Sequence, residues 1–301
     1  MNAAIETAFV EREDSSVYET VEPVLYSVAD GIATVTLNRP QFHNAQNSQM
    51  TYALDAAFQR AVNDDAVKVI VLRGAGKHFS AGHDIGTPGR DINKSFERVS
   101  GWYDHVNKPG GEFLYAREQE VYLGMCRRWR DLPKPMIAMV QGACVAGGLM
   151  LAWVCDLIVA SEEAFFADPV VRMGIPGVEY FAHPFEMHPR LAKEFLFLGE
   201  RMGARRAYEA GMVNRVVGAG CSLEQATYDI AHRIAAMPRM GLALAKQAVN
   251  HAEELGGKRA AMEAAFGWHH FAHVHNELVS GDKLGGYDAR SMASSQRKEQ
   301  A

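Results

Sequence analysis

The alternation of apolar and polar positions divides most of this chain into short strands and helices. The stretch VLYSVADGIATVTLNRP predicts a hairpin, with strands over Val24–Val28 and Ile32–Leu37 and a turn at Ala29-Asp30-Gly31. Apolar residues then recur at helical spacing between Met50 and Val62. The chain therefore opens with two strands followed by a helix.

Three later apolar runs, VKVIVLRG, PKPMIAMVQG and DLIVAS, predict strands that are buried on both faces. Ser222 is placed to cap a helix that Pro238 ends, and two more helical segments follow. Short strands that alternate with helices indicate an α/β fold. We expect residues 222–301 to be helical and to pack on another subunit.

Residues 86–125 interrupt this rhythm, because they are rich in glycine, proline and charge. We expect a long loop here that either covers a site or is mobile. Its aromatic residues could close over a ligand, or they could lie in a surface loop or a subunit contact; they are Trp102, Tyr103, Tyr115 and Tyr122.

Composition narrows the possible classes of protein. The 301 residues are 48% hydrophobic and carry a net charge of −5, which gives no electrostatic support to nucleic-acid binding. No apolar run approaches the roughly 20 residues of a membrane span, and the polar N-terminus is unlike a signal peptide. We expect a cytoplasmic protein with a loose leader (1–20), a core (21–221) and a helical region (222–301).

Two segments predict exposed backbone donors directly after core strands. They are HFSAGHDI (78–85) and GACVAGGLM, and we expect each to turn from a strand into a helix. Ala81-Gly82 and Gly147-Gly148 are small enough for a ligand to approach the main chain. Two such N–H groups that converge on one oxygen would stabilise negative charge there.

Five motifs resemble, in order, those of the enoyl-CoA hydratase/isomerase (crotonase) superfamily. They are LNRPQFHNA, HFSAGHDI, PKPMIAMVQGACVAGG, CDLIVASEEAFFADP and ARRAYEAGMVNRVV, and the resemblance covers roughly residues 24–250. It implies a spiral of ββα turns, homotrimers or hexamers, and an acyl-CoA thioester ligand, with no cofactor beyond the coenzyme A of the substrate. It also implies that the thioester oxygen lies between the N–H groups of His83 and Gly147.

The resemblance further implies a set of residues that contact the substrate. The position of Asp84 favours a helix cap over a substrate contact, and the segment after Pro40 could equally be a simple turn. The expected contacts are Gln41, Phe42, His43, Ala81, Asp84, Ile85, Gly148, Met150 and Val170.

The usual acid–base pair of the family's hydratases is absent from its two positions. Met150 and Val170 stand where those enzymes carry glutamates, and neither side chain can exchange a proton. We expect Glu179 to stand in, with a pKa raised by an apolar pocket, and His183 to be the next candidate. The alternatives are a solvated glutamate and a packing histidine, and the imidazole of His83 is a further candidate.

The segment WHHFAHVHNE raises the question of a metal site. His269 and His273 have the i, i+4 spacing of a ligand pair on a helix. The sequence offers no nearby cysteine or defined acidic partner, so we expect these histidines to pack in an interface and to bind no metal.

The sequence therefore predicts an acyl-CoA enzyme that resembles enoyl-CoA hydratase and polarises a thioester through its backbone. Because the glutamate pair is replaced, isomerase and thioester hydrolase reactions are alternatives. A non-catalytic acyl-CoA-binding protein is the alternative from another class.

Overall fold

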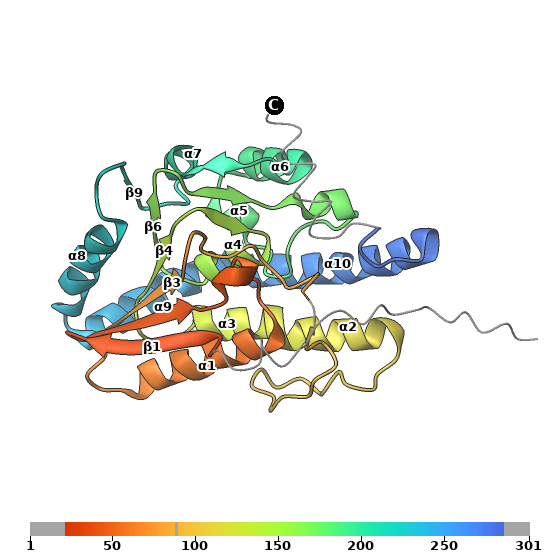
Figure 1. Cartoon of the computed structure of the whole chain (residues 1–301), viewed down its shortest axis with the longest axis horizontal. Helices are drawn as coiled ribbons and strands as arrows, with labels where there is room; N and C mark the ends of the chain where they lie inside the picture. The colour runs from red at the N-terminus through yellow and green to blue at the C-terminus, as the bar shows by residue number, and fades with distance from the viewer. Residues whose placement is uncertain (1–21, 88–89, 286–301) are drawn as a thin grey trace, which may run out of the picture.

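The computed structural model describes residues 22–87 and 90–285 and has a mixed α/β architecture (Figure 1). Within these residues the larger sheet has the strand order β1-β2-β3-β4-β6-β9, and the smaller sheet has the order β5-β7-β8. The strands are β1 (Val24–Ala29), β2 (Ile32–Leu37), β3 (Val69–Gly74), β4 (Met136–Val140), β5 (Ala143–Val145), β6 (Leu157–Ser161), β7 (Phe165–Ala167), β8 (Met202–Gly203) and β9 (Arg215–Val217).

The first two strands form the predicted antiparallel hairpin, and the remaining pairs of the larger sheet are parallel. The α-helices are α1 (Ser48–Asn63), α2 (Gly110–Glu118), α3 (Met125–Arg130), α4 (Gly147–Trp153), α5 (His183–Glu186), α6 (Pro189–Leu198), α7 (Ala204–Glu209), α8 (Leu223–Ala235), α9 (Arg239–Leu255) and α10 (Lys258–Ser280). Short 3-10 turns lie at η2 (Pro40–Phe42) and η4 (Pro169–Met173).

The larger sheet is covered on both faces, as its apolar strands predicted. Along β3, Ile70 and Leu72 point into the main core, whereas Val69 and Val71 pack in a second cluster against residues of α8. Alternate side chains of a strand point to opposite faces, so a strand between two cores carries apolar residues at every position.

The second part of the insert at residues 86–125 is helical, although the sequence predicted a long loop there. The segment over Gly110–Arg130 is helical, because the π-helical turn η3 (Gln119–Gly124) joins α2 to α3. Two buried acids hold the loop before it: Asp91 accepts from the N–H of Ser48 at 2.9 Å, and Glu120 accepts from the N–H of Val99 at 2.7 Å. A pair of glycines at its start and a weak apolar periodicity concealed this helix in the sequence.

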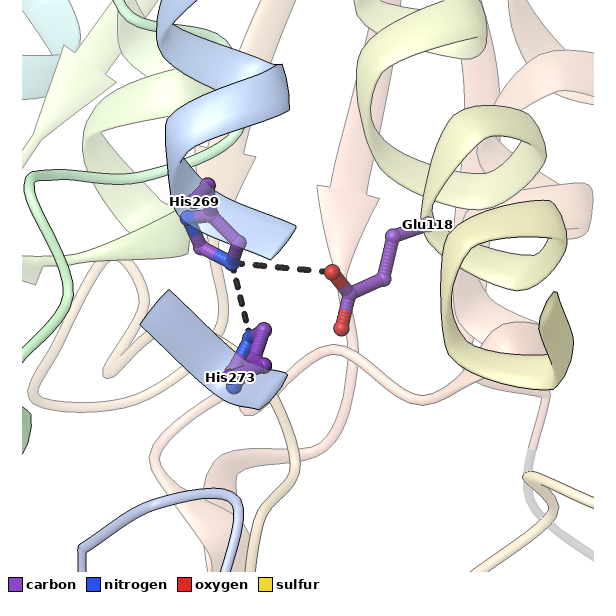
Figure 2. Close-up of side chains that lie close together, drawn as sticks. All are labelled: Glu118, His269 and His273. Carbon is purple, nitrogen blue, oxygen red and sulfur yellow. Dashed lines mark hydrogen bonds and ion pairs between the residues drawn. The ribbon is translucent and has the colours of Figure 1, made fainter. Parts of the chain in front are cut away.

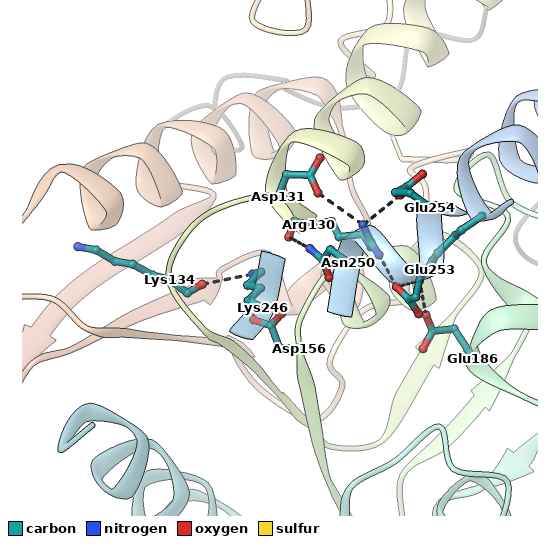
Figure 3. A network of polar contacts seen from close by, with 10 residues as sticks. Arg130, Asp131, Lys134, Asp156, Glu186, Lys246, Asn250, Glu253 and Glu254 are labelled. Carbon is teal, nitrogen blue, oxygen red and sulfur yellow. Dashed lines mark hydrogen bonds and ion pairs between the residues drawn. The ribbon is translucent and has the colours of Figure 1, made fainter. Parts of the chain in front are cut away.

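A polar network fixes the C-terminal helices to the core (Figure 3). Arg130 of α3 pairs with Glu253 and Glu254 of α9, and its carbonyl accepts from Asn250 at 3.2 Å. Lys246 contacts Asp156 at 2.9 Å. These contacts set the position of α9, and α10 follows it directly, beside α2.

The N-cap of α8 is also as predicted, since Ser222 Oγ accepts from the N–H of Gln225 at 3.1 Å. No helix in the described part of the chain combines the length and apolar character needed to cross a bilayer. The predicted loose leader (1–20) lies outside the described residues.

Candidate active site

The two glycine-containing turns lie side by side. Gln46 forms a parallel bridge with His83, in which the Gln46 N–H donates to the Gly82 carbonyl and the Asp84 N–H donates to the Gln46 carbonyl. The N–H of His83 therefore points away from Gln46. Gly147 begins α4, where an N–H has no partner within the helix.

The spacing between these turns explains their small residues. A Cβ built on Gly147 would lie 3.2 Å from the His83 nitrogen and 2.5 Å from the His83 ring. A Cβ on Gly82 would lie 3.1 Å from the Gly147 nitrogen, and Gly82 has a φ of +97°. Ala146, directly before Gly147, has φ 48° and ψ −117°, a conformation that costs energy for a residue with a side chain. The backbone is thus held in a strained arrangement that brings the two amide groups together.

Among the described residues after β3 no helix begins before Gly110, so the expected strand-to-helix geometry is wrong for residues 78–85. Asp84 consequently caps no helix. Instead its carboxylate pairs with Arg39 at 3.0 Å and accepts from the N–H of Thr87 at 3.0 Å. Asp84 therefore fastens the loop after His83 to the segment before Pro40.

The imidazole of His83 is paired with Glu179. Nε2 of His83 lies 2.8 Å from Oε2 of Glu179, and the ring stacks on Tyr122 with 3.7 Å between centroids. The hydroxyl of Tyr122 accepts from Arg117 at 3.3 Å, which holds the stacked ring in place. Nδ1 of His83 is buried and has no hydrogen-bond partner among the described residues. The free ring nitrogen is thus on the side of Gly147.

Glu179 is not the solvated loop glutamate of the alternative interpretation, because its side chain is only 3% exposed. The expected rise in its pKa is also wrong. Burial does raise the pKa of Glu179, but the charge of His83, the hydrogen bond from that ring and the charge of His269 together lower it below its ordinary value. Glu179 is therefore an ionised partner for a histidine and not a proton donor.

His183 lies in a different pair. Its Nε2 is 2.8 Å from Oδ2 of Asp168, and both side chains are fully buried. The same carboxylate accepts from the N–H of Val178 at 3.2 Å, and Trp153 packs edge-on against the imidazole. The two leading sequence candidates are therefore separated: the structure brings Glu179 to His83, and His183 to Asp168.

Met150 and Val170, which stand where the resemblance implied glutamates, are surrounded by apolar side chains. Met150 is buried in the main core, and Val170 packs beside Ile85 against Met173 and Ile175. Gly148 is so close to Ser80 that a Cβ there would lie 2.5 Å from the Ser80 carbonyl oxygen.

The segment predicted to contact the nucleotide lies in and after the turn η2. Phe42 packs under the guanidinium of Arg39, with 4.9 Å from Cζ to the ring centroid. His43 has a φ of 52° and contacts His78 edge-on. Gln41, His43 and Ala81 are exposed.

Behind Glu179 lies a row of histidines on α10 that the sequence analysis assigned to packing. Nε2 of His269 is 3.0 Å from Nε2 of His273 and 3.5 Å from Oε2 of Glu118 (Figure 2). The same nitrogen is 3.8 Å from Oε1 of Glu179. Burial and the nearby Glu179 raise the pKa of Glu118 well above its ordinary value. Burial and the two neighbouring histidines lower the pKa of His270 to about 3.

Sequence reasoning missed Glu118 and the side-chain role of Tyr122 beside His83. Both lie in the insert that was predicted as a long loop: Glu118 ends α2, and Tyr122 lies within the π-helical turn that follows. Such turns are frequent at functional sites, but no sequence pattern marks this one.

The family model described as Enoyl-CoA hydratase/isomerase matches residues 27–279. A Mycobacterium tuberculosis protein named as enoyl-CoA hydratase EchA13 is 43% identical over 277 residues, covering 89% of this chain and 83% of that protein. The 1,2-epoxyphenylacetyl-CoA isomerase of Escherichia coli is 30% identical over 243 residues, covering 77% of this chain and 84% of that protein.

Solved structures agree with this match. A crystal structure from Mycobacterium smegmatis, described as an enoyl-CoA hydratase, is 46% identical with a TM-score of 0.77, covering 86% of this chain and 98% of that one. The chain belongs to the enoyl-CoA hydratase/isomerase family.

Proposed function

We propose that this chain moves a proton at the carbon next to the carbonyl of an acyl-CoA thioester, using His83 as the base and Glu179 as its charged partner. The observation that carries the proposal is the state of the His83 ring. One nitrogen is bonded to a buried carboxylate, and the other is unpartnered beside Gly147.

The backbone supplies the other half of the chemistry. A thioester oxygen held between the N–H groups of His83 and Gly147 would accept two hydrogen bonds, which strengthen as negative charge develops on it. Removing one donor from such a pair typically costs about 10² to 10³ in rate. This role rests on the strained approach of the two turns and on the family.

In the proposed isomerisation, His83 acts first as a base and then as an acid. Nδ1 of His83 takes the α proton of a β,γ-unsaturated thioester, and the C–H electron pair moves into the carbonyl to form the enolate. The resulting imidazolium is stabilised by the carboxylate of Glu179. Return of the same proton to the γ carbon shifts the double bond and regenerates the neutral ring.

A single proton-transfer group favours isomerisation over hydration. Hydration needs one group to activate water and another to protonate carbon, whereas isomerisation needs one base that serves two carbons. Met150 and Val170 cannot supply a second group. The Escherichia coli relative is also named as an isomerase, although its named substrate is an epoxide and not an enoyl thioester.

The experiment is a panel of 3-enoyl-CoA thioesters, in which isomerisation is followed by the rise of conjugated thioester absorbance. A second assay measures deuterium exchange at the α carbon of butyryl-CoA in D₂O. This exchange reports enolate formation, whatever product the enzyme finally makes. We expect exchange with the wild type. Binding of acyl-CoA without exchange or isomerisation across the panel would contradict the proposal and favour the non-catalytic alternative.

A further inference from the structure

The cluster of Glu118, His269 and His273 has a surplus of hydrogen-bond acceptors. Nδ1 of His269 lies 2.8 Å from the carbonyl oxygen of Gly177, and Nδ1 of His273 lies 2.9 Å from that of Lys283. A carbonyl only accepts, so each Nδ1 carries its proton. In the neutral rings, both Nε2 atoms are then bare acceptors.

These bare nitrogens point at each other and at carboxylates. The two Nε2 atoms are 3.0 Å apart, and Oε2 of Glu118 is 3.5 Å from Nε2 of His269. Figure 2 shows all three side chains converging from two helices, with both histidines on α10 and the glutamate at the end of α2. Oε2 of Glu118 and Nε2 of His270, 3.3 Å apart, are buried without a hydrogen-bond partner among the described residues. Arg117 and Lys283 bring positive charge near Glu118, but acceptor atoms still face one another inside the cluster.

We propose that Glu118, His269 and His273 bind a divalent first-row transition metal of the zinc class. This inference goes beyond the proposed function, because the site lies on the far side of Glu179 from His83. The sequence around His269 and His273 offers no defined acidic partner for a metal, and the fold brings Glu118 there from α2.

The separations between the three ligand atoms are close to those expected around a tetrahedral zinc ion. Ligands bonded at about 2.0–2.1 Å around a tetrahedral zinc lie about 3.3 Å from one another. The three ligand atoms lie within 4.8 Å of one another, and two of the separations are 3.0 and 3.5 Å. Two imidazoles and one carboxylate favour zinc and its neighbours over magnesium or calcium, which prefer oxygen ligands throughout.

The backbone contacts of the two histidines also suit a metal site. Ligating histidines commonly donate their second ring N–H to a backbone carbonyl, as His269 and His273 do here. A pocket of about 470 Å³, lined in part by Tyr115, His270 and His273, gives solvent a route to the cluster. A metal here would cross-link α2 to α10, with water as a fourth ligand.

The test measures metal, so it is independent of substrate and of the proposed reaction. The full-length protein is stripped with a chelator, equilibrated with zinc sulfate, desalted and assayed for zinc by mass spectrometry. We expect about one zinc per chain, a rise in melting temperature with zinc but not with magnesium, and a four-coordinate absorption spectrum with cobalt(II).

Three variants make the test specific. Glu118→Gln and His273→Asn should each weaken zinc binding at least about tenfold. His275→Asn, which changes an exposed histidine on the same helix, should bind as the wild type does. Circular dichroism shows whether each variant is folded. Glu118→Gln nearly keeps the shape of the side chain, so it still tests the site if His273→Asn misfolds. The proposal would be overturned by a wild type that retains no zinc, or by ligand variants that retain zinc fully. The contact between His269 and His273 would then be explained by a proton that their Nε2 atoms share.

Discussion

Half-buried His83 and buried Glu179 form a pair, with 2.8 Å between Nε2 and Oε2, although 96 positions separate them in the chain. The lowered pKa of Glu179 keeps it ionised next to the imidazole. The Glu179 carboxylate orients one nitrogen of the His83 ring and leaves the other without a partner in the described part of the chain, which is the arrangement that the proposed histidine base needs.

Glu179→Gln tests this pair, because it keeps the shape of the side chain and removes its charge. We expect the turnover number to fall by about 10² to 10⁴, with little change in acyl-CoA affinity. Deuterium exchange into butyryl-CoA and isothermal titration with the same thioester measure the two quantities. Glu263→Gln, on an exposed part of α10, is the control. A fully active Glu179→Gln would show that the carboxylate has no part in the chemistry.

Gly147→Ala tests the close approach of the two turns. The new methyl group would lie 2.5 Å from the His83 ring, so the imidazole must move. We expect turnover to fall by at least about 10², since the base and an amide donor are both displaced. Gly241→Ala is the matched control, because a Cβ there meets nothing within 4 Å in α9; it should keep full activity. If Gly147→Ala is as active as Gly241→Ala, the close approach of Gly147 to His83 is not needed for activity.

The sequence predicted those parts of the fold that local patterns determine. The hairpin around Asp30-Gly31 and the cap at Ser222 depend on residues a few positions apart, and the structure confirms both. The pairing of His83 with Glu179 depends on how the turns of the chain stack, which no local pattern specifies. The same holds for Glu118, whose helix begins at two glycines and has almost no apolar face.

Glu186 gives a pH-dependent prediction for stability. Burial raises its pKa above the ordinary 4.5, and the charge of Lys258 offsets this only in part. An acid whose pKa is higher in the folded state binds more protons when the protein is folded. Its contribution to the free energy of unfolding therefore falls as the pH rises above its ordinary pKa of 4.5. Glu186→Gln should therefore raise the melting temperature at pH 7, with a gain that disappears below about pH 4. Calorimetry across that range measures it, and a variant that is less stable at pH 7 would contradict it.

The exposed apolar side chains of the last two helices predict self-association. Leu244 on α9 and Phe271 and Leu278 on α10 are 52%, 72% and 81% exposed in the isolated chain. Faces of this kind mark contact surfaces. We expect a trimer or hexamer by light scattering at micromolar concentration, and smaller species for Phe271→Asp. A monomeric wild type would contradict the expectation.

Met150 and Val170 stand where the resemblance implies the hydratase glutamates, and we therefore expect slow hydration. General acid–base help is typically worth about 10² to 10⁴ per group, so a site with one histidine should hydrate crotonyl-CoA at least about 100-fold more slowly than a two-glutamate hydratase assayed beside it. Restoring an acid at position 150 should not help, because Met150 is 1% exposed and an unpaired carboxylate there would cost about 2 kcal/mol or more of stability. Loss of conjugated thioester absorbance gives the rate, and urea unfolding of Met150→Glu gives the cost. If the wild type matches the reference hydratase, a second proton-transfer group must act in this site, and the single-base mechanism is wrong.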